Sequence, residues 1–271
     1  MLFIFLPILF AGLLYLIFLN VNSTTEWRDA FLRSAILWGI IVTVITEIAS
    51  RFNGITYGVF SIVWGGCVLI AGAWLFIQRK RKKVFHERSS YDFSSLEKFL
   101  LASIVFILLA VGLIAFLSPP NTLDSLCYHM SRVAHWIKNQ NVEFYPTSIL
   151  RQLHQGPWAE YAILQFQVLG KGDILANMVQ WFSVIGSLLG VSLITAMLGG
   201  NRSTQILASF VAVTIPMGIV QGSSTQNDYV AAFWLICFVY FIFLIRSELT
   251  WQNVAMAGFS LGLAVLTKAT V

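Results

Sequence analysis

The sequence predicts an all-α fold, a polytopic bundle of membrane-spanning helices. Hydrophobic residues make up 58% of the 271 residues and charged residues only 11%, whereas about 25% of the residues in a soluble domain are charged. The mean hydropathy is correspondingly high, at +0.78. Apolar runs of about 20 residues, the length that a helix needs to cross a bilayer, follow one another along most of the chain. Together these observations place most of the protein in lipid.

Taken in order, the apolar runs give about eight candidate spans. They cover Leu2–Leu19, Ala30–Ala49, Thr56–Ile77, Phe99–Leu117, Ile174–Leu198, Thr204–Gly222, Tyr229–Ile245 and Val254–Thr267. The first run has no basic residues before it and no small-residue cleavage site after it, so a cleavable signal peptide is not expected. Two of the three cysteines fall within apolar runs, and no disulfide framework is predicted.

Basic residues predict the membrane face on which each loop lies. The run RKRKK, Arg79–Lys83, separates the third and fourth candidate spans, and loops rich in Lys and Arg stay in the cytoplasm. By the same count, Arg202 and Arg246 fall in cytoplasmic loops. The run is therefore a topology signal, and the net charge of +5 does not indicate a nucleic-acid partner. Residues 118–173 then form a long outer loop.

The outer loop contains a first predicted interfacial helix. Loops longer than about 12–15 residues are usually functional or disordered, and helical spacing of the apolar residues argues against disorder here. Asn121 is the expected N-cap. The apolar stripe consists of Leu123, Leu126, Cys127, Met130, Ala134 and Ile137, and the polar face carries Asp124, Tyr128, His129, Arg132 and His135. Such an amphipathic helix is typical of one that lies flat on the bilayer.

A second predicted interfacial helix follows in the same loop. Pro157 suits its first turn and Gly170 its end. The helix would have about 13 residues. At about 1.5 Å per residue, a helix of that length is too short to cross the bilayer. It is mostly apolar but includes Glu160, Gln165 and Gln167, and we therefore expect it to lie deeper in the interface than the first.

Three polar features are expected to meet on the outer face of the membrane. The span count places the outer loop there, together with Asp228 at the end of the turn SSTQND and Lys268 at the far end of the last span. A pocket at that surface would have two carboxylates, Asp124 and Asp228, and at least one ammonium group available for chemistry. The sequence thus predicts a site on the outer surface rather than in the middle of the bilayer.

Each candidate residue also has a structural explanation. Asp124 is a catalytic base or metal ligand, or it complements the N-terminus of its helix, and the same alternatives hold for Asp228. Lys268 binds a phosphate, or its side chain reaches up to the interface. Arg132 and Arg151 hold a phosphate or pair with anionic lipid headgroups.

Two other groups of titratable residues give weaker signals. His129, His135 and His154 lack a metal-binding spacing such as H-E-x-x-H, so no zinc site is predicted. Glu47 is an acid within the second span, which suggests function. Its place near the outer end makes exposure to headgroups the simpler explanation.

Several segments together resemble the GT-C superfamily of polytopic glycosyltransferases, most closely bacterial members similar to protein O-mannosyltransferases and aminoarabinose transferases. The segments are Asp124 followed by YHMSRVAHW, Tyr145–Pro146, HQGPWAEY (154–161), STQNDY (224–229) and GLAVLTKATV (262–271). HQGPWAEY resembles a family His-Pro-Pro-Leu motif with Gly156 in place of one proline. The resemblance covers residues 98–271, and the order of the motifs is more specific than any one of them.

The resemblance implies transfer of a sugar from a polyprenyl-phosphate donor to a lipid, glycan or protein acceptor at the outer face of the cell membrane. Asp124 would act as the base. Lys268, Arg132 and Arg151 would bind the donor phosphate, because a departing phosphate requires positive charge. Asp228, Glu160 and His129 would position the acceptor or a metal ion. A divalent cation held by Asp124 and Asp228 is the one cofactor that the resemblance allows.

The resemblance also implies a division of the chain. Residues 1–97 would be an N-terminal three-helix membrane extension with the cytoplasmic basic loop, and residues 98–271 the N-terminal part of the transferase domain. Members of the family continue with further spans, so the chain is expected to be truncated, and its activity in this form is an open question. Two other functions compete with transfer. A transporter or flippase of lipid-linked glycans would place charges at the bilayer midplane, and a membrane scaffold would need no site.

Overall fold

The computed structural model describes residues 2–21, 26–79 and 92–270, and within these ranges all regular secondary structure is helical. The predicted all-α class is therefore confirmed for the described part of the chain. Of the basic run predicted to set the topology, only Arg79 belongs to the described residues, and Lys80–Lys83 lie outside them.

Six helices in the described residues are long and apolar enough to cross a membrane, which indicates a multi-pass membrane protein. Large apolar side chains such as Ile62 and Phe106 point away from the protein on two of them, as lipid-facing residues would. The six are α1 (Leu6–Val21, preceded by the short 3-10 helix η1, Leu2–Phe5), α2 (Trp27–Arg51), α3 (Tyr57–Arg79), α4 (Ser95–Leu117), α8 (Met178–Met197) and α11 (Asp228–Ser247).

The two remaining predicted spans differ from these six. The prediction of one continuous helix over Thr204–Gly222 is wrong, because α9 (Arg202–Val213) ends before Pro216 and α10 (Pro216–Gln221) begins at it. A proline has no backbone N–H to donate and disfavours helical geometry in the residue before it, and Ile215 is extended. The last helix, α12 (Trp251–Thr267), is continuous but has 17 residues. The total of eight spans stays a prediction.

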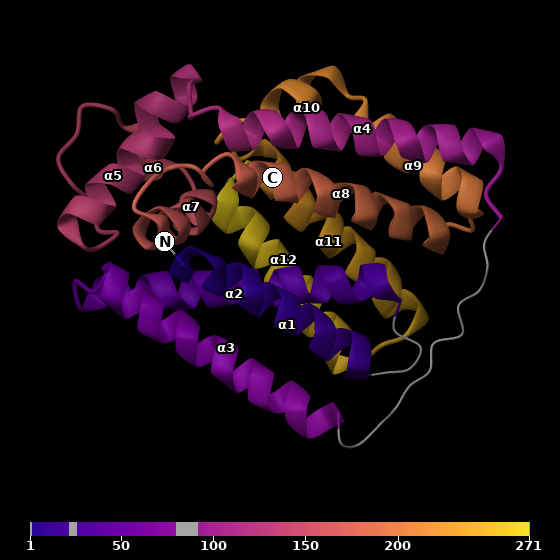
Figure 1. Cartoon of the computed structure of the whole chain (residues 1–271), viewed down its shortest axis with the longest axis horizontal. Helices are drawn as coiled ribbons and strands as arrows, with labels where there is room; N and C mark the ends of the chain where they lie inside the picture. Colours follow the sequence, from indigo (N-terminus) through magenta and orange to yellow (C-terminus); the bar gives the residue numbers. More distant parts are fainter. Residues whose placement is uncertain (1, 22–25, 80–91, 271) are drawn as a thin grey trace.

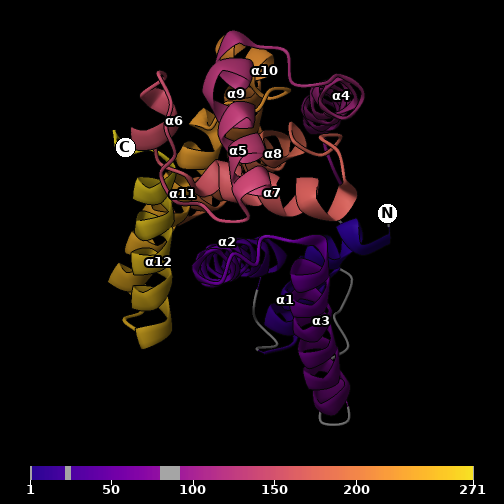
Figure 2. The same cartoon turned by 90° about the vertical axis from the view of Figure 1, so that its left-hand side faces the viewer.

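The helices form two groups, and the short helix α7 (Trp158–Gly170) lies between them near one end of the molecule (Figures 1 and 2). On one side, α1 packs against α2 and α3; on the other, α8 packs against α4, α9 and α11, and α11 also packs against α12. One hydrophobic core includes residues from α1–α3 and from α7, α8, α11 and α12. The predicted domain division at residue 97 is not tested by this packing, but the core joins residues from both sides of it.

The first helix of the outer loop presents its polar face to the protein. It begins after Thr122, whose Oγ1 accepts a hydrogen bond from the Ser125 N–H at 3.1 Å, so Thr122 rather than the predicted Asn121 caps it. A π-helical turn, η2 (Ser125–His129), leads into α5 (Met130–Asn139). The apolar Leu123 is 77% exposed, whereas His129 and Arg132 are each 1% exposed. The apolar side of this helix is therefore the one available to lipid.

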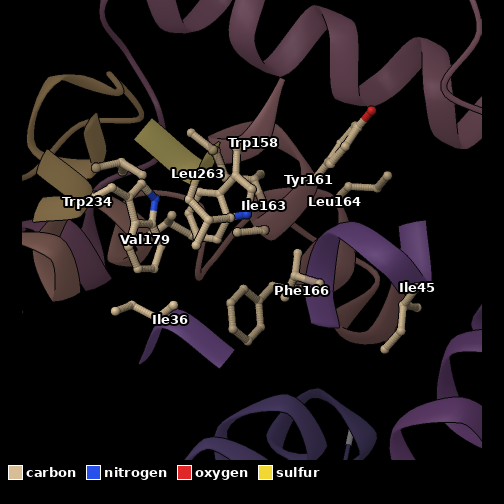
Figure 3. Close-up of a cluster of buried hydrophobic side chains, with 14 of the residues drawn as sticks. Ile36, Ile45, Trp158, Tyr161, Ile163, Leu164, Phe166, Val179, Trp234 and Leu263 are labelled. Carbon is tan, nitrogen blue, oxygen red and sulfur yellow. The ribbon is translucent and has the colours of Figure 1, made fainter. Parts of the chain in front are cut away.

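The second helix of the loop, α7, begins and ends where the sequence predicts, between Pro157 and Lys171. Its place in the interface stays a prediction, but the helix is buried in protein, because α2, α3, α5, α8 and α12 all pack against it. Figure 3 shows its aromatic and branched side chains interleaved with residues of α2, α8, α11 and α12. The labelled residues are Ile36, Ile45, Trp158, Tyr161, Ile163, Leu164, Phe166, Val179, Trp234 and Leu263.

Two polar residues of α7, Gln165 and Tyr161, have hydrogen-bond partners in the surrounding helices, which explains how they are buried. Gln165 donates to Thr46 Oγ1 at 2.8 Å and accepts from the Trp64 indole at 2.9 Å. The Tyr161 hydroxyl donates to Glu47 at 2.6 Å. Glu47, the intramembrane acid noted in the sequence, thus has a structural partner. A buried polar group is stable only when it is hydrogen-bonded, and these bonds fix α7 against α2 and α3.

Candidate functional site

Three segments that are distant in sequence meet at the end of the molecule occupied by α5, α6 (Arg151–His154) and α7 (Figure 1). The Thr225 hydroxyl, in the turn before α11, donates to Ser125 Oγ at 2.6 Å. Gly156 lies against the last turn of α12, where a Cβ would be 2.5 Å from the Leu266 carbonyl oxygen. The predicted convergence of the outer loop with the ends of α11 and α12 is therefore confirmed as geometry.

Asp228 and Lys268 form an ion pair at this junction. The Lys268 Nζ lies 2.6 Å from Asp228 Oδ1, and each side chain is a little more than one-third exposed. Asp228 is the first residue of α11 and Lys268 follows the last residue of α12. The neighbouring Asn227 donates to the Thr267 carbonyl at 3.1 Å, which holds the two helix ends together. The topology alone predicted this proximity, and the direct contact is a finding of the structure.

Asp124, directly before η2, and Arg151, the first residue of α6, form a second acid–base pair. Arg151 Nη1 lies 3.6 Å from Asp124 Oδ1, and the Arg151 side chain is 63% exposed. The Asp124 carboxylate also lies near the Tyr128 phenol and raises its pKa. Because Thr122 caps the helix, the Asp124 carboxylate is not used as the cap. Its side chain therefore faces Tyr128, Arg151 and solvent.

Beneath these two pairs lies a buried cluster of His129, Glu160 and Arg132. His129 Nδ1 and Glu160 Oε1 are 2.6 Å apart, so the ring N–H donates to the carboxylate. Arg132 Nη1 lies 3.6 Å from the same oxygen. The other oxygen, Glu160 Oε2, is buried without a hydrogen-bond donor among the described residues. These three residues are inside the protein, where they support the surface pairs from below.

Arg132 holds the segment that carries Arg151. Its Nε donates to the Gln152 carbonyl at 2.6 Å, and its Nη2 donates to the Arg151 carbonyl at 3.1 Å and the Gln155 carbonyl at 3.0 Å. A guanidinium with this many acceptors at 1% exposure has no surface left for a ligand. The predicted contact of Arg132 with a donor phosphate therefore does not fit the structure, because its donors are used by the backbone of α6.

Gln152 is a structural residue of the site that the sequence did not indicate. Its amide donates to the Cys127 carbonyl at 2.7 Å and accepts from the Tyr145 hydroxyl at 3.1 Å. The Tyr145 ring in turn stacks on His135 at 4.1 Å between centroids. These contacts join the Tyr145–Pro146 segment to α5. A lone glutamine in a polar stretch gives no sequence signal, so only its burial shows its role.

The residues do not fit a divalent cation. No group of three or more His, Cys, Asp or Glu side chains in the described ranges is arranged to hold a metal. Asp124 already pairs with Arg151, and Asp228 with Lys268. Each of the two carboxylates is matched by a basic side chain, which offsets the negative charge that would attract a cation. The predicted metal role of Asp124 and Asp228 is therefore not supported by the site.

Gly156→Ala is expected to destabilise the junction. The new Cβ would be 2.5 Å from the Leu266 carbonyl oxygen and 2.7 Å from that of Thr267, and backbone atoms cannot yield as a flexible side chain does. We expect a loss of about 1–3 kcal/mol in the free energy of unfolding, measured by denaturant titration in detergent. Gly172→Ala is the matched control, because a Cβ there meets nothing within 4 Å. Equal stability of the two variants would show that the junction is loosely packed.

Tyr128→Phe is expected to change the stability of the protein in alkali. Burial and the Asp124 carboxylate raise the pKa of the Tyr128 phenol from 10.0 to about 12. Because the folded state binds this proton more tightly, the stabilisation is present below about pH 10 and is lost between about pH 10 and pH 12. The free energy of unfolding should therefore fall less across this range in the variant than in the wild type. Identical pH dependence would rule out this contribution.

Comparison with protein-family models, with characterised proteins and with solved structures finds no match to this chain. The function is therefore inferred from the site itself, together with the family resemblance of the sequence.

Proposed function

We propose that the protein is an integral membrane glycosyltransferase of the GT-C type. It would transfer a sugar from a polyprenyl-phosphate donor to an acceptor hydroxyl at the extracytoplasmic face of the cell membrane. The observation that carries this proposal is the presence of two acid–base pairs, Asp124–Arg151 and Asp228–Lys268, on segments that touch through Ser125 and Thr225. All four charged side chains are partly exposed, so a substrate can reach them.

The two pairs supply what this transfer needs. The acceptor oxygen attacks the anomeric carbon, the bond from that carbon to the phosphate oxygen breaks, and the acceptor proton moves to a base. The Asp124 carboxylate, which is partly exposed beside Arg151, would be that base. The polyprenyl phosphate leaves with its bonding electrons, and a fixed positive charge stabilises it. Lys268 and Arg151 supply that charge, while Asp228 orients the acceptor.

The buried residues have a positioning role in this proposal. His129, the last residue of η2, and Glu160 of α7 do not reach the surface, so they hold the helical segment that follows Asp124 rather than contact the acceptor. Arg132 similarly fixes the backbone of Arg151. Catalysis of this kind depends mainly on holding the reacting groups in place and excluding water, and a rigid buried support suits it.

A reconstituted assay tests the proposal directly. The purified full chain is placed in liposomes with a polyprenyl-phosphate sugar labelled on the sugar, together with lipid, glycan and peptide acceptors. We expect the label to move to one acceptor class. Movement of intact labelled lipid between leaflets without transfer would instead establish a transporter. If the label neither transfers nor crosses, while the protein retains its helical circular dichroism, the chain has no such activity and is a membrane scaffold.

A further inference from the structure

The acid–base pairs lie at the edge of the molecule. Figure 2 faces the end that carries them, and in that view α6 and the C-terminus both lie at the edge of the cartoon. Arg151 is the first residue of α6, and Lys268 follows α12 close to the C-terminus. The basic member of each pair is therefore next to whatever surrounds the helices, rather than in a channel between them.

This edge is at the level where membrane-spanning helices end. Asp228 is the first residue of α11, which is long and apolar enough to cross a membrane. Thr225, three residues earlier, hydrogen-bonds to Ser125, so η2 stands at the same level. The ends of spanning helices lie at headgroup depth. A side chain exposed at this edge therefore meets lipid headgroups and the first carbons of the acyl chains.

Each member of the Asp124–Arg151 pair directly follows an exposed leucine. Leu123 is 77% exposed and Leu150 is 68% exposed. The charged groups of Asp124 and Arg151 approach to 3.6 Å, so the two leucines flank one acid–base pair. Leu123 and Asp124 are both helical, and successive residues of a helix are about 100° apart around its axis. Leu123 is therefore beside the carboxylate and not behind it.

The second pair also has an exposed apolar neighbour. Val265 lies one turn before Lys268 in α12 and is 50% exposed. The surface next to the ammonium group, on the side toward the middle of the bilayer, is therefore apolar as well. A molecule that reaches either pair from the side of the protein passes an apolar side chain before it meets a charged one.

We infer that the acceptor of the proposed transfer is a membrane lipid with a hydroxyl in its headgroup, and that Leu123 and Leu150 hold its apolar part beside Asp124. The inference rests on the proposed function. The headgroup oxygen bonds to the anomeric carbon, and its proton moves to the Asp124 carboxylate. The polyprenyl phosphate leaves with the electron pair of the broken bond. The product is a glycolipid that stays in the bilayer.

Two exposed leucines beside the reacting groups favour a lipid over a water-soluble acceptor. A lipid buries apolar area against them, and the burial of one leucine side chain is worth roughly a tenfold gain in binding. A glycan or a polar peptide that arrives from water has no apolar group to place there. It would also have to displace the surrounding lipid from the leucines.

Liposomes that contain the full chain and the sugar-labelled donor test the acceptor class. Phosphatidylglycerol and a glycosyl diacylglycerol are each supplied beside an equal amount of their water-soluble, deacylated headgroups. We expect a new labelled lipid to form at least about tenfold faster than any labelled water-soluble product. Equal labelling of the deacylated forms, or transfer only to a glycan or peptide, would overturn the lipid acceptor and leave the proposed transferase standing. Transfer to no acceptor would remove both.

Leu150→Gln tests the role of the apolar neighbours. It should raise about tenfold the mole fraction of lipid acceptor that gives the half-maximal rate, with the maximal rate and the donor requirement unchanged. Leu123→Gln should act in the same way. Leu198→Gln is the matched control, because Leu198 is also 68% exposed but follows α8 at the other end of the molecule (Figure 1).

Thermal unfolding of each preparation shows whether these variants fold, and substitutions of exposed residues are expected to leave the unfolding temperature unchanged. Equal effects of Leu150→Gln and Leu198→Gln on the acceptor requirement would overturn the inference. A rise in the donor requirement alone would assign Leu150 to the polyprenyl chain of the donor and would also overturn it.

Discussion

Asp124→Asn is expected to abolish sugar transfer while the protein stays folded. An amide cannot take the acceptor proton at neutral pH, and loss of a positioned general base typically lowers a rate by about 10²–10⁴-fold. Tyr128 and Arg151 remain free to hydrogen-bond to the amide oxygen, so the local structure has no reason to change. Substitutions of partly exposed residues away from caps and buried networks usually alter stability by less than about 0.5 kcal/mol, and Thr122, not Asp124, is the cap.

The measurement is the initial rate of label transfer in liposomes at saturating donor, with thermal unfolding of the same preparation as the check on folding. Asp173→Asn is the matched control, because Asp173 is an exposed aspartate in the same outer segment. It should keep the wild-type rate. If Asp124→Asn transfers sugar as fast as Asp173→Asn does, Asp124 is not the base. The carboxylate is then an electrostatic partner of Arg151 only.

The contrast between the two helices of the outer loop shows what the sequence could predict. Pro157 and Gly170 mark the ends of α7 correctly, because turn and cap chemistry is local. The environment of the helix is not local. An apolar helix of 13 residues has the same pattern whether lipid or protein surrounds it, and only Glu160 and Gln165 hinted that protein does. Polar groups of that kind are buried only where partners exist, and the partners come from α2 and α3 for Gln165 and from η2 and α5 for Glu160.

The span over 204–222 fails for the opposite reason. The segment is mostly apolar, and a hydropathy average over it does not detect a single proline. Pro216 nevertheless interrupts the helix, since it removes a donor and constrains Ile215. Counting spans placed Asp228 and Lys268 at the same end of the helices. The count fixes only which end each residue occupies, so it did not predict their direct contact. Whether a basic residue at that end is exposed or buried is beyond such a count.

Arg132 and Arg151 show that the sequence does not reveal which basic residues are buried. From the sequence both were phosphate ligands. In the structure Arg151 is mostly exposed, whereas Arg132 is buried with three short bonds to backbone carbonyls and a carboxylate at 3.6 Å. Arg132→Gln would remove the guanidinium from the buried Glu160 carboxylate, which keeps its hydrogen bond with His129, and would take the Arg132 donors from several backbone carbonyls. Removing one partner of a buried ion pair costs about 3–5 kcal/mol, which is a large part of the total stability of a typical protein.

Arg132→Gln is therefore expected to lower the free energy of unfolding by about 3–5 kcal/mol, measured by denaturant titration in detergent. Arg151→Gln, the matched control, should change it by less than about 0.5 kcal/mol but should slow sugar transfer. Arg132→Lys restores the charge without the planar fork of donors, so it should recover only part of the loss.

The double variant Arg132→Gln/Glu160→Gln keeps the test informative even if the single variant does not fold. With both charges removed, no isolated carboxylate remains inside the protein. The double variant should therefore be more stable than Arg132→Gln, and the coupling energy follows from the double-mutant cycle. A double variant as unstable as the single one would mean that the backbone carbonyls of α6, and not Glu160, are what Arg132 stabilises. A wild-type stability for Arg132→Gln would contradict the buried cluster altogether.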